Sequence, residues 1–188
     1  MAKYYFRLVL LIGGIIGFFA LVGSLLPRGY SIDCDIEIAA PADQIFAQIN
    51  SLENWQHWSS WDPERISGLT VVVVGDPGVG NAMQWTDLRG EGKLWITASQ
   101  PPEFVEYRLL FDRFPEMSSR MTLIPQADSD RTVVQWNSRG RLPGGPFYGY
   151  LAPLFPIHLR YEYDDCLVRL KERVEKKITA DSAERPED

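Results

Sequence analysis

One long hydrophobic run opens the chain. Residues 8–26 read LVLLIGGIIGFFALVGSLL, with no charged side chain and one hydroxyl group. A helix over this run would be ~28 Å long, close to the ~30 Å hydrocarbon core of a bilayer. Hydrocarbon offers no partner to backbone polar groups, so a segment that crosses it must satisfy them by helical bonding. The pattern predicts a transmembrane helix from Leu8 to Leu26.

A cleavable secretory signal is the main alternative to this anchor, and a buried soluble helix is a second one. The apolar part of a signal spans ~7 to 15 residues before a small-x-small cleavage site. This run is longer and ends in SLLPR at 24–28, without such a site. Lys3 and Arg7 precede the run and Arg28 alone follows it before acidic residues begin. The positive-inside rule therefore predicts a single-pass protein of the cell (inner) membrane, with a cytoplasmic N-terminus and the remainder outside, or periplasmic.

Strict alternation begins shortly after the hydrophobic run. Residues 31–38 read SIDCDIEI, which sends every second, apolar side chain to one face and predicts a half-buried antiparallel strand. Two short helical patterns follow, one over 42–50 and a second from Leu52 to Asp62-Pro63.

The rest of the chain alternates in short runs and then becomes helical. Turn clusters rich in glycine, proline and aspartate separate six further strand patterns at 69–74, 82–86, 93–99, 104–111, 119–125 and 132–138. Apolar residues from Leu159 to Ile178 then recur at helical spacing, which predicts a long C-terminal helix. The organisation expected is an anchor over 1–28, one α+β domain over 29–179 and a disordered polar tail over 180–188.

Composition narrows the classes of function. The 188 residues leave room for one domain beside the anchor. The part after Arg28 holds all 25 acidic residues and 16 of the 19 basic ones, a net charge of −9. Such an acidic domain is a poor partner for a phosphate backbone, so nucleic acid is excluded as a partner. Two cysteines without C-x-x-C spacing and two histidines predict no metal site, and no cofactor is expected.

Particular segments resemble a known superfamily. They are IEIAAPADQIF at 36–46, WQHWSSWDP at 55–63, GVG at 78–80, Trp85, Gly92, Tyr107, Trp136, LVRLK at 167–171 and Val174-Glu175. Together they resemble the SRPBCC (START/polyketide-cyclase-like) superfamily, especially membrane-anchored members known as polyketide cyclase/dehydrase and lipid-transport domains. The resemblance covers Tyr30 to Glu175. One departure is that Ser60 stands where relatives often have proline.

The resemblance implies a helix-grip (START-like) fold, in which a curved antiparallel sheet wraps the long C-terminal helix around a cavity. Members bind hydrophobic small molecules there, and a minority catalyse cyclisation or dehydration. Alternation directs apolar and aromatic side chains inward, and a lipid-like ligand prefers such a lining. The candidate lining residues are Trp85, Ile96, Tyr107, Leu109, Met121, Leu123 and Trp136. The alternative is a filled core without a usable void.

A second apolar segment follows the last strand. Residues 147–156 are aromatic and interrupted by prolines, which stop a continuous helix. Our hypothesis is a short lid over the cavity mouth, or a segment that dips into the bilayer surface, formed by Phe147, Tyr150, Leu151 and Phe155. An ordinary buried helix start is the alternative.

Three further groups of residues have competing interpretations. In the resembled fold, Cys34 and Cys166 lie on elements that pack together, so a disulfide is possible and two buried free thiols are the alternative. The tryptophans at 55, 58 and 61 are expected to pack under the sheet, with an interfacial membrane contact as the alternative. Glu162, with Asp164 and Asp165, falls mostly off the apolar stripe and is expected on a solvated face.

The short linker also bears on function. Residues 27–30 alone separate the hydrophobic run from the first strand, which keeps the domain within ~14 Å of a membrane surface. The sequence favours membrane-anchored, non-catalytic binding of a lipid or other hydrophobic small molecule. The alternatives are a cyclase- or dehydratase-type enzyme, for which Tyr107 is the one polar cavity candidate, and a structural or interaction module of a membrane complex.

Overall fold

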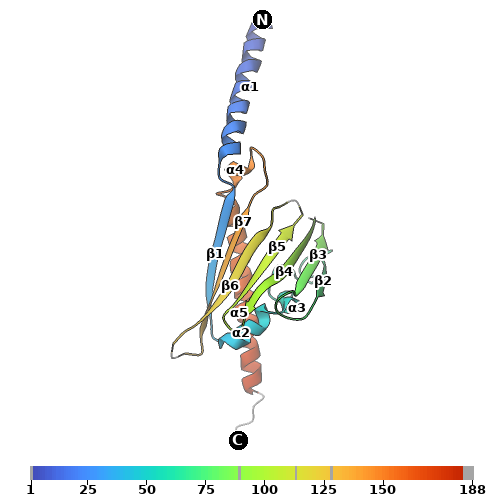
Figure 1. Cartoon of the computed structure of the whole chain (residues 1–188), viewed down its shortest axis with the longest axis vertical. Helices are drawn as coiled ribbons and strands as arrows, with labels where there is room; N and C mark the ends of the chain where they lie inside the picture. Colours follow the sequence, from blue (N-terminus) through green and yellow to red (C-terminus); the bar gives the residue numbers. More distant parts are fainter. Residues whose placement is uncertain (1, 89, 113, 128, 184–188) are drawn as a thin grey trace.

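The computed structural model describes residues 2–88, 90–112, 114–127 and 129–183. Its first element is α1 (Ala2–Leu25), which extends away from the other elements (Figure 1). The segment Lys3–Leu25 is long and apolar enough to cross a membrane. Most of its large hydrophobic side chains are exposed, because no other part of the chain covers them.

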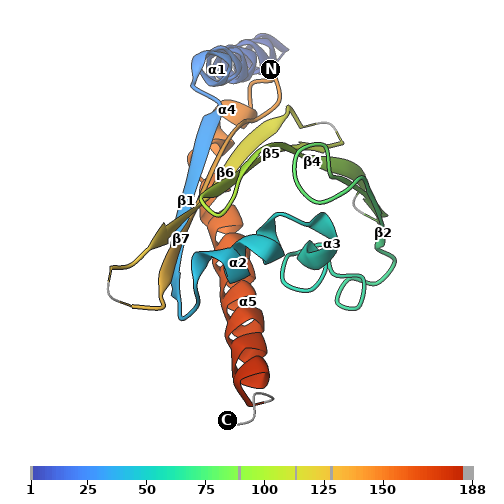
Figure 2. The same ribbon diagram turned by 60° about the horizontal axis from the view of Figure 1, so that its bottom comes forward.

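Seven antiparallel strands form one sheet in the order β1-β7-β6-β5-β4-β3-β2. The strands are β1 (Gly29–Ile38), β2 (Thr70–Val74), β3 (Ala82–Asp87), β4 (Gly90–Gln100), β5 (Phe104–Phe111), β6 (Met117–Pro125) and β7 (Thr132–Arg141). The long helix α5 (Phe155–Ala183) packs against β1, and the sheet curves over α2 (Ala42–Ile49) and α3 (Leu52–Trp55) (Figure 2). The predicted α+β helix-grip fold is confirmed.

The core follows from the alternation in the strands. Successive strand side chains point to opposite faces, so the apolar half of each strand can be buried against α5 and the short helices. The buried inward residues are Met83, Trp85, Leu94, Ile96, Val105, Tyr107, Met121, Leu123, Val134 and Trp136, and Leu109 and Phe111 are half-buried. Removal of this apolar surface from water is the main term that favours the fold.

The second short helix is shorter than predicted. It ends at Trp55, and the chain then turns, with the amides of Trp58 and Ser59 both donating to the Trp55 carbonyl. The turn brings Trp55 and Trp58 together under the sheet, where both are fully buried with ring centroids 4.8 Å apart. Packing under the sheet is therefore confirmed for these two tryptophans, and they make no interfacial contact.

The C-terminal helix is longer than expected. Ion pairs one turn apart line its polar face, for example Asp165 with Arg169 at 3.2 Å and Lys171 with Glu175 at 3.4 Å. Pairs with this spacing stabilise a helix modestly. The helix continues to Ala183, so residues 180–183 are helical where a disordered tail was expected, and 184–188 lie outside the described residues.

Cys34 and Cys166 are both free and buried in this structure. Cys166 lies 3.3 Å from the Ser60 hydroxyl, whereas Cys34 lies on β1 near Asp164. Residues 164 and 166 are ~200° apart around a helix. Cys166 therefore points to a different side of α5 from the side that Cys34 approaches.

A short helix between β7 and α5, α4 (Tyr148–Leu151), packs against α1. The Tyr150 hydroxyl donates to the Phe19 carbonyl at 2.9 Å. Gly23 and Gly149 meet where the two helices cross, and a Cβ added to either glycine would collide with backbone of the other segment. The glycines thus permit a close approach of α4 to the last turns of α1.

Candidate functional site

The candidate site is an apolar cavity of about 390 Å³ between the first turns of α5 and the sheet. It lies near the end of the domain to which α1 is attached, because Tyr30 at the start of β1 and Phe155 at the start of α5 both line it (Figure 1). Its lining residues are Tyr30, Ser60, Trp61, Trp85, Leu109, Phe111, Phe114, Pro115, Met117, Trp136, Phe155, His158, Leu159, Glu162, Tyr163 and Cys166.

Aromatic rings form most of the cavity wall. Trp85 stacks on Phe111 at 6.2 Å and meets Trp61 at 5.0 Å, and Trp136 stacks on Tyr163 at 4.2 Å. Gly92 lies opposite Trp85 in the neighbouring strand, where any side chain would collide with the indole. Flat, rigid apolar walls of this kind suit a hydrophobic ligand.

Phe155 lies among aromatic residues at the α1 end of the cavity. Its ring contacts Tyr30 edge-on at 5.0 Å and stacks on Phe114 at 6.0 Å. Of the four residues in the lid hypothesis, Phe155 alone lines the cavity. Phe147, Tyr150 and Leu151 lie at α4, outside the lining, and all three are exposed, Phe147 the most at 76%.

The structure divides the candidate lining residues into two groups. Trp85, Leu109 and Trp136 line the cavity. Ile96, Tyr107, Met121 and Leu123 are buried in the core beyond its wall. All seven face inward, but alternation assigns a face and does not say how far along the strand the empty space extends.

Several polar lining residues were not among the sequence candidates. Ser60 donates to Glu162 Oε2 at 3.1 Å, and His158 and Glu162 belong to the lining. Positions 158, 162 and 166 recur at intervals of one helical turn, which places them on one side of α5. That spacing, with serine at position 60 in place of the usual proline, was the available signal.

A buried hydrogen-bonding cluster lies behind the wall. Trp136 Nε1 donates to the Tyr107 hydroxyl at 2.8 Å, and Ser119 and Ser138 share a hydrogen bond of 2.6 Å. Burial raises the pKa of Tyr107 well above its ordinary value and raises the pKa of Tyr163 to about 12. Both phenols are therefore protonated near neutral pH, where they act as hydrogen-bond donors and not as bases.

Stability should decline at alkaline pH. Burial raises the pKa of Cys34 to about 12 and that of Cys166 to about 11, from an ordinary value of 9.0. Below pH 9 the two thiols are protonated in both the folded and the unfolded chain. Above pH 9 they ionise first in the unfolded chain, because their pKa values are lower there. The free energy of unfolding therefore falls between pH 9 and 12. Chemical denaturation at pH 8 and pH 10 should show this loss, and a chain with both cysteines changed to alanine should show a smaller one. An equal loss in that variant would contradict the assignment.

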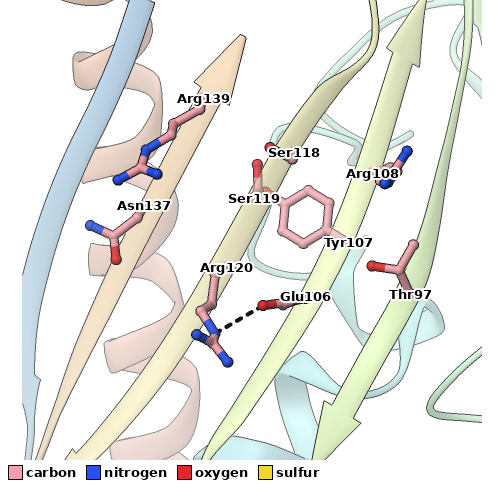
Figure 3. A pocket seen from close by; sticks show the side chains of 9 residues that line it. All are labelled: Thr97, Glu106, Tyr107, Arg108, Ser118, Ser119, Arg120, Asn137 and Arg139. Atoms are coloured by element: carbon pink, nitrogen blue, oxygen red, sulfur yellow. Dashed lines mark ion pairs between the residues drawn. The ribbon is translucent and has the colours of Figure 1, made fainter.

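A larger concavity, of about 540 Å³, lies on the sheet face that points away from α5 (Figure 3). Its side chains are mostly polar or charged, including Arg108, Arg120 and Arg139. Arg120 pairs with Glu106 at 3.2 Å and Arg108 pairs with Glu116. Exposed pairs of this kind are typical of a solvated sheet face. Among the described residues, no group of three or more His, Cys, Asp or Glu could hold a metal ion.

The sequence over residues 31–175 matches the family described as polyketide cyclase / dehydrase and lipid transport. This match covers most of the chain and all of the sheet except the first two residues of β1. The chain belongs to this family. A comparison with curated proteins found no match.

Solved structures share the fold of this family member at low sequence identity. Norcoclaurine synthase from Thalictrum flavum, in complex with dopamine and hydroxybenzaldehyde, is 14% identical with a TM-score of 0.62, covering 82% of this chain and 91% of that one. A protein from Thermus thermophilus is 15% identical with a TM-score of 0.60, covering 78% and 98%. The di-domain ARO/CYC StfQ of the steffimycin biosynthetic pathway is 13% identical with a TM-score of 0.58, covering 81% and 53%.

Proposed function

We propose that this polyketide cyclase/dehydrase and lipid transport family member is a membrane-anchored, non-catalytic binding protein for a lipid or similar hydrophobic small molecule. The observation that carries the proposal is the aromatic cavity at the α1 end of the domain. A structural or interaction module would need no such space, because a filled core is more stable than one with a void.

The dimensions and chemistry of the cavity indicate the kind of ligand. Its volume of about 390 Å³ lies near the lower end of small-molecule sites, ~300 to 1,000 Å³. Ser60, His158 and Glu162 add hydrogen-bonding groups to an otherwise apolar lining. This combination suits an amphiphile that places one acyl chain or compact ring system inside and a polar group against α5.

The anchor determines where the ligand would be met. The apolar helix α1 ends at Leu25 and β1 begins at Gly29, so the domain cannot travel from the surface of a membrane that α1 spans. Lys3 and Arg7 before the apolar run support a cytoplasmic N-terminus, with the domain outside. Binding would therefore be local, by extraction, presentation or sensing at that surface.

Catalysis of the cyclase or dehydratase type is the second candidate, and the buried tyrosine cluster is the observation that favours it. Tyr163 lines the cavity and Tyr107 lies behind Trp136. Protonated phenols could donate to a ligand carbonyl, but the two tyrosines supply no base near neutral pH. Tyr163→Phe should leave ligand affinity within about 3-fold if the protein only binds, a difference of less than ~1 kcal/mol.

The test of binding uses the full chain in nanodiscs with pyrenedecanoic acid. Three tryptophans line the cavity, so a bound pyrene should quench their emission by energy transfer. Saturable transfer, together with an amphiphile in an organic extract of the purified protein, is the expected result. Absence of both would overturn the proposal.

A further inference from the structure

The contact between α1 and α4 fixes the depth of α4 relative to the apolar run. Tyr150 donates to the carbonyl of Phe19, which lies ~9 Å before the end of α1 at Leu25. Gly149 packs on Gly23, also within the run. If α1 spans a bilayer, α4 cannot remain in the water above it.

The surface of this segment agrees with that depth. Around α4 and the start of α5, four large apolar side chains are exposed: Phe147 by 76%, Leu154 by 60%, Ile157 by 56% and Leu151 by 49%. We call these four residues the collar. The collar lies at the same end of the domain as α1, whose surface is apolar as well (Figure 1). Interfacial segments bury their apolar side chains ~5 to 10 Å into the boundary between headgroups and acyl chains.

Basic residues accompany the collar. Arg28 donates to the Pro143 carbonyl at 3.3 Å, which holds its guanidinium beside the loop that leads to α4. Arg141 ends β7 opposite Gly29. In a domain that is acidic overall, these two arginines bring positive charge to the α1 end, and positive charge is attracted to anionic lipid headgroups.

The collar adjoins the lining of the cavity along the chain. Leu154 of the collar is followed by Phe155, whose ring lies between Tyr30 and Phe114 in the cavity lining. A molecule that passes the Phe155 ring therefore moves between the collar surface and the aromatic interior.

We propose that the collar is immersed in the bilayer and that the cavity opens into the membrane past Phe155, so its ligand is a membrane-resident amphiphile that enters sideways and not from water. The route of the ligand rests on the proposed function. The immersion of the collar rests on the membrane anchoring in that proposal but not on ligand binding, because it is argued from the contact between α1 and α4 and from the exposed apolar side chains.

Immersion is tested with a fluorescent probe on Leu151→Cys in the full chain, reconstituted in nanodiscs. The matched control is Val79→Cys, which is 66% exposed in a turn beside the end of α2, away from α1. The unaltered chain, whose cysteines are both buried, measures background labelling. Quenching of the Leu151 probe by nitroxide lipids, at least 3-fold above that of the Val79 probe, is expected. Quenching by aqueous iodide instead, or shielding from both quenchers by a protein partner, would overturn the proposal.

The route is tested with Leu151→Glu/Leu154→Glu, and Val79→Glu is the control. Charges in the collar oppose immersion, so uptake of pyrenedecanoic acid already present in the nanodisc should slow about 10-fold, while affinity in detergent remains unchanged. Unchanged uptake, or uptake that is faster from aqueous albumin than from the nanodisc, would overturn the sideways route. No binding in any chain would overturn the proposed function instead, and the immersion result would still be decided by the quenching.

Discussion

Replacing Leu159 with tryptophan is expected to weaken binding of pyrenedecanoic acid at least 100-fold while the fold is kept. Leu159 is half-buried on α5, packs against the core and lines the cavity. The larger indole can extend into the empty volume of about 390 Å³. Filling a void avoids most of the strain of ~1 to 3 kcal/mol that a larger side chain causes in a packed core. Energy transfer from tryptophan to pyrene, titrated in the full chain, measures the change.

The matched control for this substitution is Val168→Trp. Val168 lies on the same helix, is 45% exposed and is not part of the cavity lining. The substituted tryptophan adds to the background emission without occupying the cavity. The affinity for pyrenedecanoic acid should therefore remain within 2-fold of that of the unaltered chain. Equal affinity in the Leu159 variant, with an unchanged melting temperature, would show that the probe binds elsewhere.

Replacing Trp55 with alanine is expected to destabilise the domain by ~3 to 5 kcal/mol, the range for removal of a large aromatic core side chain. Trp55 is fully buried, and its ring contacts Trp58, Tyr107 and Trp136. Its Nε1 donates to the Ile49 carbonyl at 2.9 Å, and that acceptor would lose its partner. Thermal denaturation should show a fall in melting temperature of ~6 to 20 °C for a domain of this size.

Trp95→Ala is the control for the Trp55 substitution. Trp95 lies on β4 and is half-buried, outside the core cluster, and Lys93 lies 5.6 Å above its ring. This change should cost less than ~1 kcal/mol, as at most surface positions. Equal losses from the two variants would mean that the tryptophan cluster is not the centre of the core.

Patterns that depend on neighbours along the chain predicted much of the fold. The alternation over 104–111 correctly predicted the bounds of β5, because a strand with one buried face shows its position directly in its alternating apolar residues. The second helix was predicted too long, because regularly spaced tryptophans fit both a helix and a turn that gathers their rings. Tertiary packing decides between the two, and here it favours the turn after Trp55.

The candidate site could be predicted only in part. The sequence indicated that Tyr107 and Leu109 face the same side, yet Tyr107 is enclosed and Leu109 borders the cavity. That difference depends on where α5 begins relative to the strands, and the alternation within a strand carries no information about this position. The bond from Ser60 to Glu162 joins residues 102 positions apart, so the helical spacing that places Glu162 on one side of α5 could not identify Ser60 as its partner.

The close contact of α1 and α4 at Gly23 and Gly149 makes the position of α4 dependent on how α1 sits in a bilayer. Since α4 is held on the last turns of α1, a span that tilts or shifts in its bilayer moves α4 with it. Hydrophobic spans respond to bilayer thickness by tilting or by local adjustment of the lipid, at a cost of fractions of a kcal/mol per Å. If α1 spans a bilayer and the cavity opens past Phe155, a thicker bilayer would draw Phe155 deeper and a thinner one would lift it toward water, so lipid chain length would act on the opening of the cavity.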